Sequence, residues 1–264
     1  MARTPAYQAR NFLIQATLRR DEIPSFEEYP FSIPAIRDFH ELEFEQPVTF
    51  FIGENGSGKS TLLEAIAVAW GLNPEGGSRN FGFSTRASHS VLKDYLRLAK
   101  APRRPRDSFF LRAESYFNLA TNIEQLDEDP LAGPRIINSY GGKSLHEQSH
   151  GESFFALFTN RLRGPGLYIF DEPEAALSPT RQLAFLTRLH ELVGKGSQFL
   201  IATHSPILMA YPQAAIYLLA DGAPSLIPYS ETEHYRVTRQ FLTRTGQMLD
   251  ILLNETGEAE PTGK

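Results

Sequence analysis

The sequence predicts an α/β fold with a largely parallel central sheet that helices cover on both sides. Two observations predict this class: short apolar runs rich in aromatic and β-branched residues recur along the chain, and amphipathic helical patterns separate them. Strands that alternate with helices in this way usually pair in parallel, because each connecting helix returns along one face of the sheet. The runs expected to form strands are 12–18, 48–52, 108–112, 167–170, 198–202 and 215–219.

Two segments carry the clearest helical signals. The first, 60–70, stops at Gly71, because glycine readily takes the backbone conformation that ends a helix. The second, 179–193, follows the start signal Ser178-Pro179. Apolar residues recur in it at three- and four-residue steps, so we expect one face to pack on a sheet. These residues are Leu183, Leu186, Leu189 and Val193.

Composition limits the classes of protein that fit. The chain has 264 residues with 41% hydrophobic residues, which is enough for a substantial core. It contains no cysteine, so disulfides, thiolate metal sites and cysteine nucleophiles are excluded. The longest apolar run, 214–220, is too short to cross a bilayer, and the first residues resemble no signal peptide. We therefore expect a cytoplasmic protein.

Charge gives no overall reason to bind nucleic acid, since the formal net charge is -5. One local cluster of basic residues is the exception. It could contact a phosphate backbone or an acidic partner, or it could form a solvated surface loop. Its members lie around two prolines, and they are Arg97, Lys100, Arg103, Arg104 and Arg106.

Residues 53–60 fit the phosphate-loop pattern, directly after one expected strand and before one expected helix. Glycines let successive N–H groups point at the same phosphates, and the helix N-terminus adds its positive dipole end. Lys59 would reach the β- and γ-phosphates, and Ser60 would offer a hydroxyl to magnesium. The alternative is a simple glycine-rich turn. The loop residues expected to bind nucleotide are Gly53, Glu54, Asn55, Gly56, Ser57, Gly58, Lys59 and Ser60.

A second element is the apolar strand 167–170, which ends in two acids, Asp171 and Glu172. In phosphoryl-transfer ATPases such a strand presents an aspartate to magnesium. Asp171 is therefore a magnesium candidate, and Glu172 could orient or deprotonate an attacking water. Two solvated acids at a strand end are the alternative.

Two further elements of the sequence could also contact the phosphates of a nucleotide. Ser149 and Gly151 lead an expected helix over 153–162, and a helix tip led by serine and glycine is a second anion site. The alternative is a capping box between Ser149 and Glu152. His204 follows the strand 198–202, where an imidazole can reach a γ-phosphate, and Ser205 would cap a helix in either case.

These four elements, in the order in which they occur along the chain, resemble those of the ABC ATPase superfamily, and the resemblance runs over about 12–219. The family's signature Leu-Ser-Gly-Gly-Gln has an altered form at 148–152, which keeps the serine and the second glycine. The resemblance implies a P-loop NTPase fold with a mostly parallel central sheet, an antiparallel β part and a small helical insertion. It implies one domain over 1–264, with a helical and signature subdomain at about 85–155 and a mobile tail at 254–264.

The resemblance also implies the cofactors ATP and Mg²⁺. Lys59, Ser60 and Thr61 correspond to phosphate and magnesium contacts, and Asp171 corresponds to a metal residue. The family's glutamine after the central strand corresponds to Glu114, a third metal candidate besides Ser60 and Asp171. An acid at that place would change how magnesium is held.

The remaining roles concern hydrolysis. Glu172 corresponds to the catalytic carboxylate and His204 to the γ-phosphate switch. Ser149 and Gly151 would serve the ATP that is held by the opposite chain, so the resemblance implies an ATP-dependent head-to-tail homodimer. The adenine platform stays open among four residues. These are Tyr29, Phe31, Arg37 and Phe39.

The resemblance leads us to expect an ATPase whose ATP-driven dimerisation acts as a switch on an unknown protein partner. The segment 171–179 is similar to that of free-standing ATPases of the AAA and SMC-like type, and the stretch between Glu114 and Ser149 is short for docking on a membrane subunit. The alternatives are the ATP-binding subunit of a transporter and an ATP-dependent scaffold with little turnover.

Overall fold

A computed structural model of the chain describes residues 11–74, 76–77, 90–113, 116–127, 135–143 and 150–254. Its main sheet has six strands, of which the last is antiparallel to its neighbour and the other five are parallel. The predicted parallel sheet is confirmed, and each predicted strand in it agrees within one residue. In spatial order the strands are β5 (Asp107–Arg112), β6 (Gly166–Asp171), β7 (Gln198–Ala202), β3 (Val48–Ile52), β8 (Ala215–Leu218) and β9 (Ser225–Leu226).

A separate antiparallel sheet has the order β2 (Glu41–Glu43), β1 (Leu13–Leu18) and β4 (Leu96–Lys100). The expected antiparallel part is thus present. Strand β4 was not predicted, although Leu96 and Leu98 alternate with Arg97, which is the pattern of a half-buried strand. Arg97 and Lys100 therefore lie in a strand, whereas the other three members of the basic cluster lie in the following loop.

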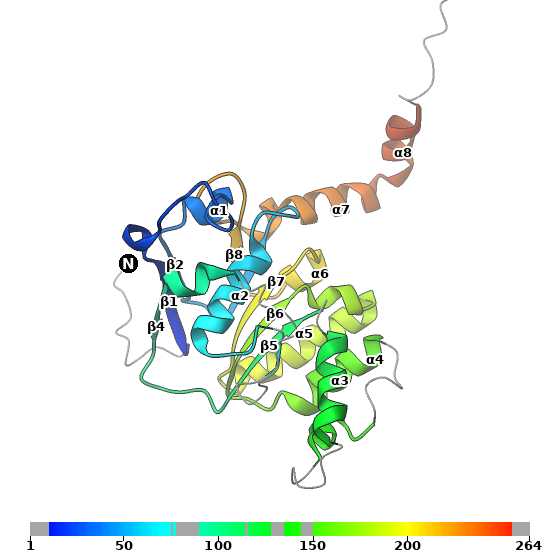
Figure 1. Cartoon of the computed structure of the whole chain (residues 1–264). Helices are drawn as coiled ribbons and strands as arrows, with labels where there is room; N and C mark the ends of the chain where they lie inside the picture. Colours follow the sequence, from blue (N-terminus) through cyan, green and yellow to red (C-terminus); the bar gives the residue numbers. More distant parts are fainter. Residues whose placement is uncertain are drawn as a thin grey trace, which may run out of the picture.

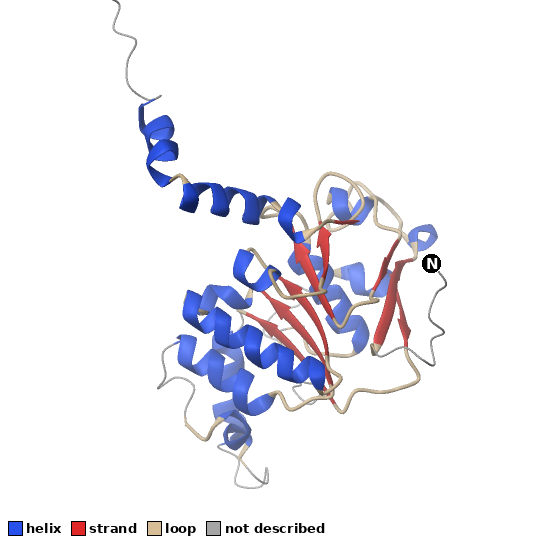
Figure 2. Cartoon of the chain, turned by 180° about the vertical axis from the view of Figure 1, so that it is seen from behind, coloured by secondary structure: helices blue, strands red, loops and turns tan. Residues whose placement is uncertain are grey.

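Helices cover both faces of the main sheet (Figures 1 and 2). Strands β3, β6 and β7 are buried at every position, as a parallel sheet covered on both faces requires. One face packs against α1 (Pro34–Arg37), α2 (Lys59–Trp70) and the antiparallel sheet. The other packs against α3 (Tyr116–Asp127), α4 (His150–Ala156), the π-helical turn Leu157–Arg161, α5 (Pro179–Gly194) and α6 (Pro206–Met209).

The buried face of α5 differs from the predicted one. Leu183 is 57% exposed, whereas Phe185 is fully buried. The prediction followed the leucine spacing alone, but the large ring of Phe185 fits between Phe158 and Phe170, and this turns the helix away from Leu183. Leu189 is buried as predicted, and Leu186 and Val193 are half-buried.

The C-terminal helices were not predicted from the sequence. After the 3₁₀ turn Tyr229–Glu231, α7 (Glu233–Thr243) and α8 (Thr245–Asn254) project away from the sheets (Figures 1 and 2). Residues 255–264 of the predicted tail lie outside the described residues. Helices α3 and α4 fall within the segment 85–155, whose status as a subdomain stays a prediction. No helix in the described ranges has the length and apolar character to span a membrane.

One buried side chain joins the two sheets. The Oε1 atom of Gln198, at the start of β7, accepts hydrogen bonds of 2.9 Å from the backbone N–H groups of Phe12 and Leu13. Its Nε2 atom donates to the carbonyl of Leu13 at 2.8 Å. Because Gln198 is only 1% exposed, water cannot replace these bonds.

We expect Gln198→Leu to lower the free energy of unfolding by about 3 kcal/mol or more, since it leaves buried backbone groups without partners. Urea denaturation followed by circular dichroism measures this loss. The control is Gln240→Leu on the exposed surface of α7, which should change stability by less than about 0.5 kcal/mol. Equal effects of the two variants would contradict a joining role for Gln198.

Candidate nucleotide-binding and catalytic site

The phosphate loop connects β3 to α2, and its conformation depends on glycine. Gly53 has a φ of 148°, and a Cβ atom there would lie 2.1 Å from the carbonyl oxygen of Leu219. Gly58, which caps α2, has a φ of 96°, and its Cβ would lie 3.0 Å from Ile33. Both positions combine a left-handed backbone with close neighbours, so larger residues would distort the loop. The loop is therefore a glycine-lined cradle at the start of a helix.

Lys59 is buried, and its Nζ atom donates to the carbonyls of Gly53 and Glu54 at 2.9 and 2.8 Å. Burial lowers the pKa of Lys59, while the negative charges of Glu172 and Asp171 raise it and so oppose this effect. The ammonium group thus lies inside the curve of the loop, with carboxylates close by.

The phosphate loop and the acidic strand meet directly. The hydroxyl of Ser60 donates a 3.0 Å hydrogen bond to Oδ1 of Asp171, across 111 residues of sequence. Asp171 ends β6 and is 6% exposed. A hydroxyl and a carboxylate are oxygen ligands of the kind that Mg²⁺ prefers. Two of the three residues predicted to hold magnesium, Ser60 and Asp171, are therefore adjacent.

Arg112 is a residue of this site that the sequence reasoning did not identify. It lies opposite Asp171 in the pairing of β5 and β6, and its Nε atom is 3.6 Å from Oδ2 of Asp171. Its Nη1 atom also forms a 2.6 Å ion pair with Glu64 of α2. An arginine at the end of an expected strand was the available signal. The metal candidate Glu114, two residues further, lies outside the described residues.

Glu172 adopts a left-handed backbone, with φ 51° and ψ 52°. Its N–H donates to the carbonyl of Ala202 in β7 at 3.0 Å, which holds the residue in this conformation. Its Oε1 atom is 3.5 Å from Nε2 of His204. A non-glycine residue in this region costs of order 1 kcal/mol, and such strain tends to occur at functional sites.

His204 is held on several sides. Its N–H donates to Oε1 of Glu174 at 2.5 Å, and its Nδ1 atom is 3.1 Å from Nε2 of His234. Burial lowers the pKa of His204, and so do the charges of Lys59 and His234, whereas Glu172 raises it. The predicted cap is confirmed, because Ser205 Oγ accepts from the first N–H groups of α6.

Glu174 and His234 also escaped the sequence reasoning. Burial raises the pKa of Glu174, against the opposing hydrogen bond from the N–H of His204. His234 lies in the first turn of α7, which Thr232 caps. Glu174 lies within the segment 171–179, whose similarity to free-standing ATPases assigned it no role of its own. Nothing in the sequence near His234 indicated that it would contact His204.

A cavity of about 1070 Å³ opens at this site. Part of its wall comes from the phosphate loop at 53–57 and from His204. The opposite part comes from the first turns of α7, including His234 and Val237. The C-terminal helix thus lines the same space as the phosphate loop.

The remaining predicted residues are placed as follows. Ser149 lies outside the described residues. Gly151 lies against Arg181 and Ala176 of its own chain, and a Cβ atom there would lie 2.2 Å from Nη1 of Arg181. The hydroxyl groups of Thr61 and Tyr29 are 3.2 Å apart.

The four residues that were predicted as possible adenine platforms differ in how deeply they are buried. Phe31 and Phe39 are core side chains, with exposed fractions of 3% and 1%, so they offer no ring face for stacking. Tyr29 is 67% exposed, and the Arg37 side chain is 49% exposed. These two remain as candidates.

Comparisons with known proteins agree with this geometry. A family model described as "AAA domain" matches residues 30–120, and one described as "AAA domain, putative AbiEii toxin, Type IV TA system" matches residues 92–210. A "Putative ABC transporter ATP-binding protein" of Methanothermobacter thermautotrophicus is 27% identical over 86% of this chain and 86% of that protein. A counterpart in Methanothermobacter marburgensis is 25% identical over 86% and 87%.

Among solved structures, the SMC head domain from Thermotoga maritima is 16% identical, with 82% of this chain and 98% of that chain covered, at a TM-score of 0.43. The two family models and the two Methanothermobacter relatives agree with the class that the four motifs predicted. Together they support an ABC-type P-loop ATPase.

We expect the stability of the protein to fall as pH decreases below the ordinary histidine value of 6.5, and His204 to contribute to this loss. The folded state disfavours protonation of His204, so the unfolded state binds more protons as pH falls toward the lowered pKa of the folded state. Unfolding by urea at about pH 7.5 and about pH 5.5 measures the difference.

The matched variant is His204→Gln, which cannot titrate at this position. It should lose less stability than the wild type between the two pH values. A pH dependence as steep as that of the wild type would show that the environment of His204 does not disfavour its protonation.

Proposed function

We propose that the chain binds ATP with Mg²⁺ in the glycine-lined cradle and hydrolyses it. The observation that carries this proposal is the 3.0 Å hydrogen bond between Ser60 and Asp171. It joins the phosphate loop to the acidic strand at the edge of the sheet where ligands of open α/β folds bind. The two Methanothermobacter relatives are named as ATP-binding proteins, which supports the same ligand.

Each residue of the cradle has a role in nucleotide binding. The N–H groups of the loop and the start of α2 face the phosphates, whose charge the helix dipole favours. Lys59 moves from its loop carbonyls to the β- and γ-phosphates. Ser60 and Asp171 would hold Mg²⁺, which would neutralise charge on the phosphates. Tyr29, exposed beside Thr61, offers a ring for the adenine.

Hydrolysis then depends on Glu172 and His204. The Glu172 carboxylate orients the attacking water and accepts its proton. His204 donates from Nε2 to the γ-phosphate. Because its lowered pKa keeps the ring neutral, a proton on Nε2 leaves Nδ1 free to accept from Nε2–H of His234. His234 thus sets the tautomer that His204 needs.

The site is completed in a head-to-tail dimer. The glycine cradle presents one side of the nucleotide, and Ser149 and Gly151 of a second protomer bind the γ-phosphate from the other side. This part of the proposal comes from the resemblance to ABC ATPases. ATP then closes the dimer and hydrolysis opens it, which lets the chain act as a switch on a partner protein.

A second candidate function is that of the ATP-binding subunit of a transporter. The printed names of the two Methanothermobacter relatives favour it. The two functions share the same chemistry and differ in the partner. Purification of the protein from its native cells, followed by identification of what accompanies it, separates them: a stably bound membrane protein supports the transporter.

Lys59→Ala should weaken ATP binding by about ten- to a hundredfold, because it removes a charge-assisted contact with the phosphates. Isothermal titration calorimetry with MgATP measures the affinity. Lys195→Ala, at an exposed position after α5, is the control and should bind as the wild type does. Unchanged affinity of Lys59→Ala would contradict the assignment of the cradle.

Glu172→Gln should lower kcat by about 10²- to 10⁴-fold while ATP binding persists, since only the proton acceptor is lost. The variant should therefore accumulate as an ATP-bound dimer. Sedimentation velocity at micromolar concentration, with and without MgATP, measures this.

A second substitution tests the composite site. Ser149→Arg in the Glu172→Gln background should keep ATP affinity and prevent the dimer. A Glu172→Gln protein that remains monomeric with ATP would remove the dimer from the proposal. ATP binding by the cradle would then still stand on its own measurement.

A further inference from the structure

A second cavity, of about 550 Å³, lies at the opposite edge of the main sheet. Asp107, which begins β5, is in its wall, whereas Arg112 at the other end of β5 contacts Asp171. A strand of six residues spans about 20 Å, so this cavity is separate from the nucleotide site. The loop between β4 and β5 forms most of its rim.

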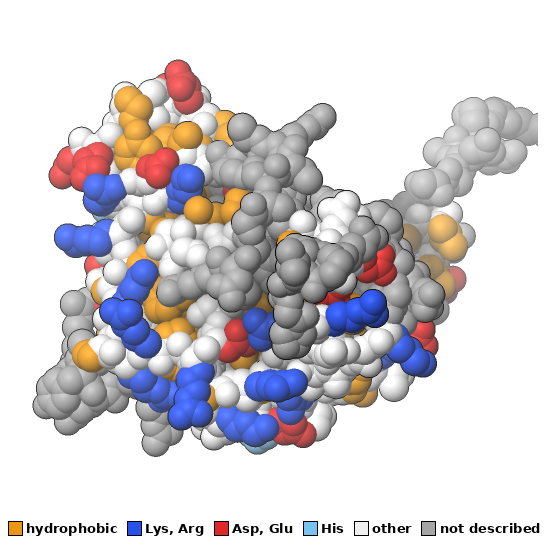
Figure 3. Space-filling view, turned by 60° about the horizontal axis from the view of Figure 1, so that its bottom comes forward, with side chains coloured by type: hydrophobic (Ala, Val, Ile, Leu, Met, Phe, Trp, Pro, Cys, Tyr) orange, Lys and Arg blue, Asp and Glu red, His pale blue; other side chains and the backbone are white. Residues whose placement is uncertain are grey.

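Basic side chains dominate this cavity, and we call it the basic groove. Among the residues that the structure describes, its lining holds five bases and one acid, Asp107, although the whole chain has a net charge of -5. In Figure 3, Lys and Arg side chains gather across the face that includes this edge of the sheet. The five bases are Lys100, Arg103, Arg104, Arg106 and Arg161.

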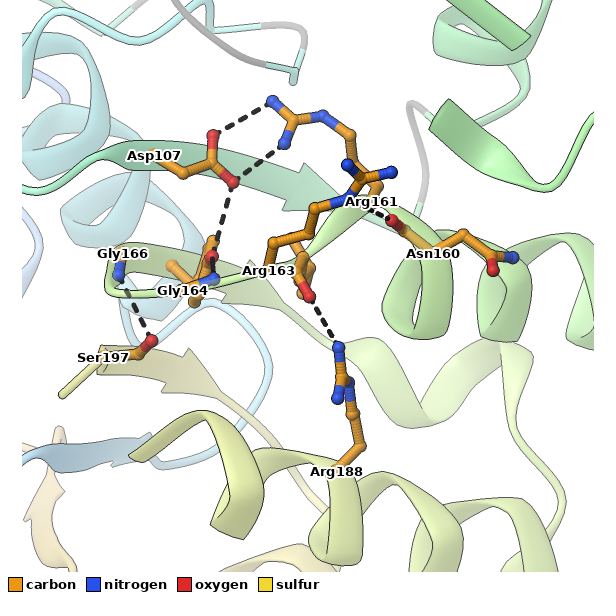
Figure 4. A network of polar contacts seen from close by, with 10 residues as sticks. Asp107, Asn160, Arg161, Arg163, Gly164, Gly166, Arg188 and Ser197 are labelled. Atoms are coloured by element: carbon orange, nitrogen blue, oxygen red, sulfur yellow. Dashed lines mark hydrogen bonds and ion pairs between the residues drawn. The ribbon is translucent and has the colours of Figure 1, made fainter. Parts of the chain in front are cut away.

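The single acid is already neutralised from within the fold. Nη1 and Nη2 of Arg161 bind both oxygens of Asp107 at 2.8 and 3.0 Å (Figure 4). The hydroxyl of Tyr168 donates to the same carboxylate at 3.3 Å. Arg103, Arg104 and Arg106 of the lining are not part of this ion pair, and their positive charge can meet a ligand.

Two bases of the lining contact aromatic rings, and one of them also contacts a carbonyl. The Arg103 guanidinium lies 4.7 Å from the ring centre of Phe12, and its Nη2 donates to the carbonyl of Gly196 at 3.1 Å. Nζ of Lys100 lies 4.5 Å from the ring centre of Trp70. Aromatic rings and carbonyls orient a cation without removing its formal charge.

The backbone of the rim is fixed at both ends. The N–H of Ala101 donates to Phe12 at 2.8 Å, and the N–H of Arg106 donates to Pro165 at 3.0 Å. Between these anchors, Pro102 and Pro105 restrict the chain further. Arg104 and Arg106 are exposed on this anchored segment. The backbone that carries these arginines is therefore fixed before any ligand arrives, which reduces the entropy cost of binding.

We propose that the basic groove binds the phosphate backbone of a nucleic acid. Arg103, Arg104 and Arg106 carry planar guanidinium groups, which fit phosphate oxygens in pairs. A protein partner would normally need an exposed apolar anchor. The one large ring in the lining, Trp70, is only 5% exposed and lies beneath Lys100. The concave shape favours an inserted strand of phosphates over a flat lipid surface.

The proposal goes beyond the nucleotide site and does not depend on it. The test uses the whole chain without ATP and a fluorescein-labelled DNA of about 20 base pairs at about 50 mM salt, with anisotropy as the readout. The double variant Arg104→Glu, Arg106→Glu should bind at least about 100-fold more weakly than the wild type. It should also reduce the slope of log K against log salt by about 2.

The matched control is Arg236→Glu, Arg244→Glu, which makes the same charge change at exposed positions in and just after α7. Its affinity should change less than about threefold. The urea midpoint and ATPase rate of the groove variant should equal those of the wild type.

Three results would overturn the proposal. One is the absence of DNA binding by the wild type at micromolar concentration. Another is an equal loss in the control variant, which would indicate attraction without a site. The third is preferential binding to polyglutamate, or to phosphatidylserine vesicles, over DNA at matched charge, since it would assign the groove to an acidic protein or a membrane.

Discussion

The parallel pairing of β3, β7 and β6 is the constraint on which the site depends. In this pairing Phe51 lies opposite Ala202, and Ala202 lies opposite Asp171, so the carboxyl ends of the three strands reach the same edge. The residues that follow each strand must then lie together, however far apart they are in sequence. The contact between Ser60 and Asp171 is the direct result of this register.

Charged groups at that edge balance one another rather than face water. Lys59 and Asp171 are nearly inaccessible, with exposed fractions of 4% and 6%. An isolated buried charge would be costly, but here a cation lies among several carboxylates and next to loop carbonyls. Arg112 adds a second cation, which lies close to the carboxylates of Glu64 and Asp171. The site therefore holds its charges in place through mutual compensation.

The sequence predicted the elements with strong local signals and missed those that depend on distant contacts. The parallel strands and α2 have apolar runs and glycine stops that act within a few residues, so their bounds were predicted closely. The prediction of the buried face of α5 was wrong because Phe185 packs on rings from the π-helical turn and β6. Helix periodicity cannot reveal such contacts. The antiparallel β4 was missed because its apolar positions are few.

The same limit on prediction from sequence applies to the residues of the site. The phosphate loop and the acidic strand carry their chemistry in contiguous residues, and their contact follows from the sheet. Arg112 and His234 contribute through register and through a helix that returns to the cavity after the last strand. No local pattern encodes such a return. Tertiary packing, rather than motif spacing, decides which residues surround the predicted ones.

Helix α7 has a geometry with mechanical consequences. Its first turn lines the cavity beside the phosphate loop, while its later residues leave the body of the protein. Eleven helical residues make a rod about 16 Å long, so a tilt of about 10° at the base displaces the far end by about 3 Å. A tilt of that size beside His204 would therefore move the exposed far end of α7 by about the diameter of an atom.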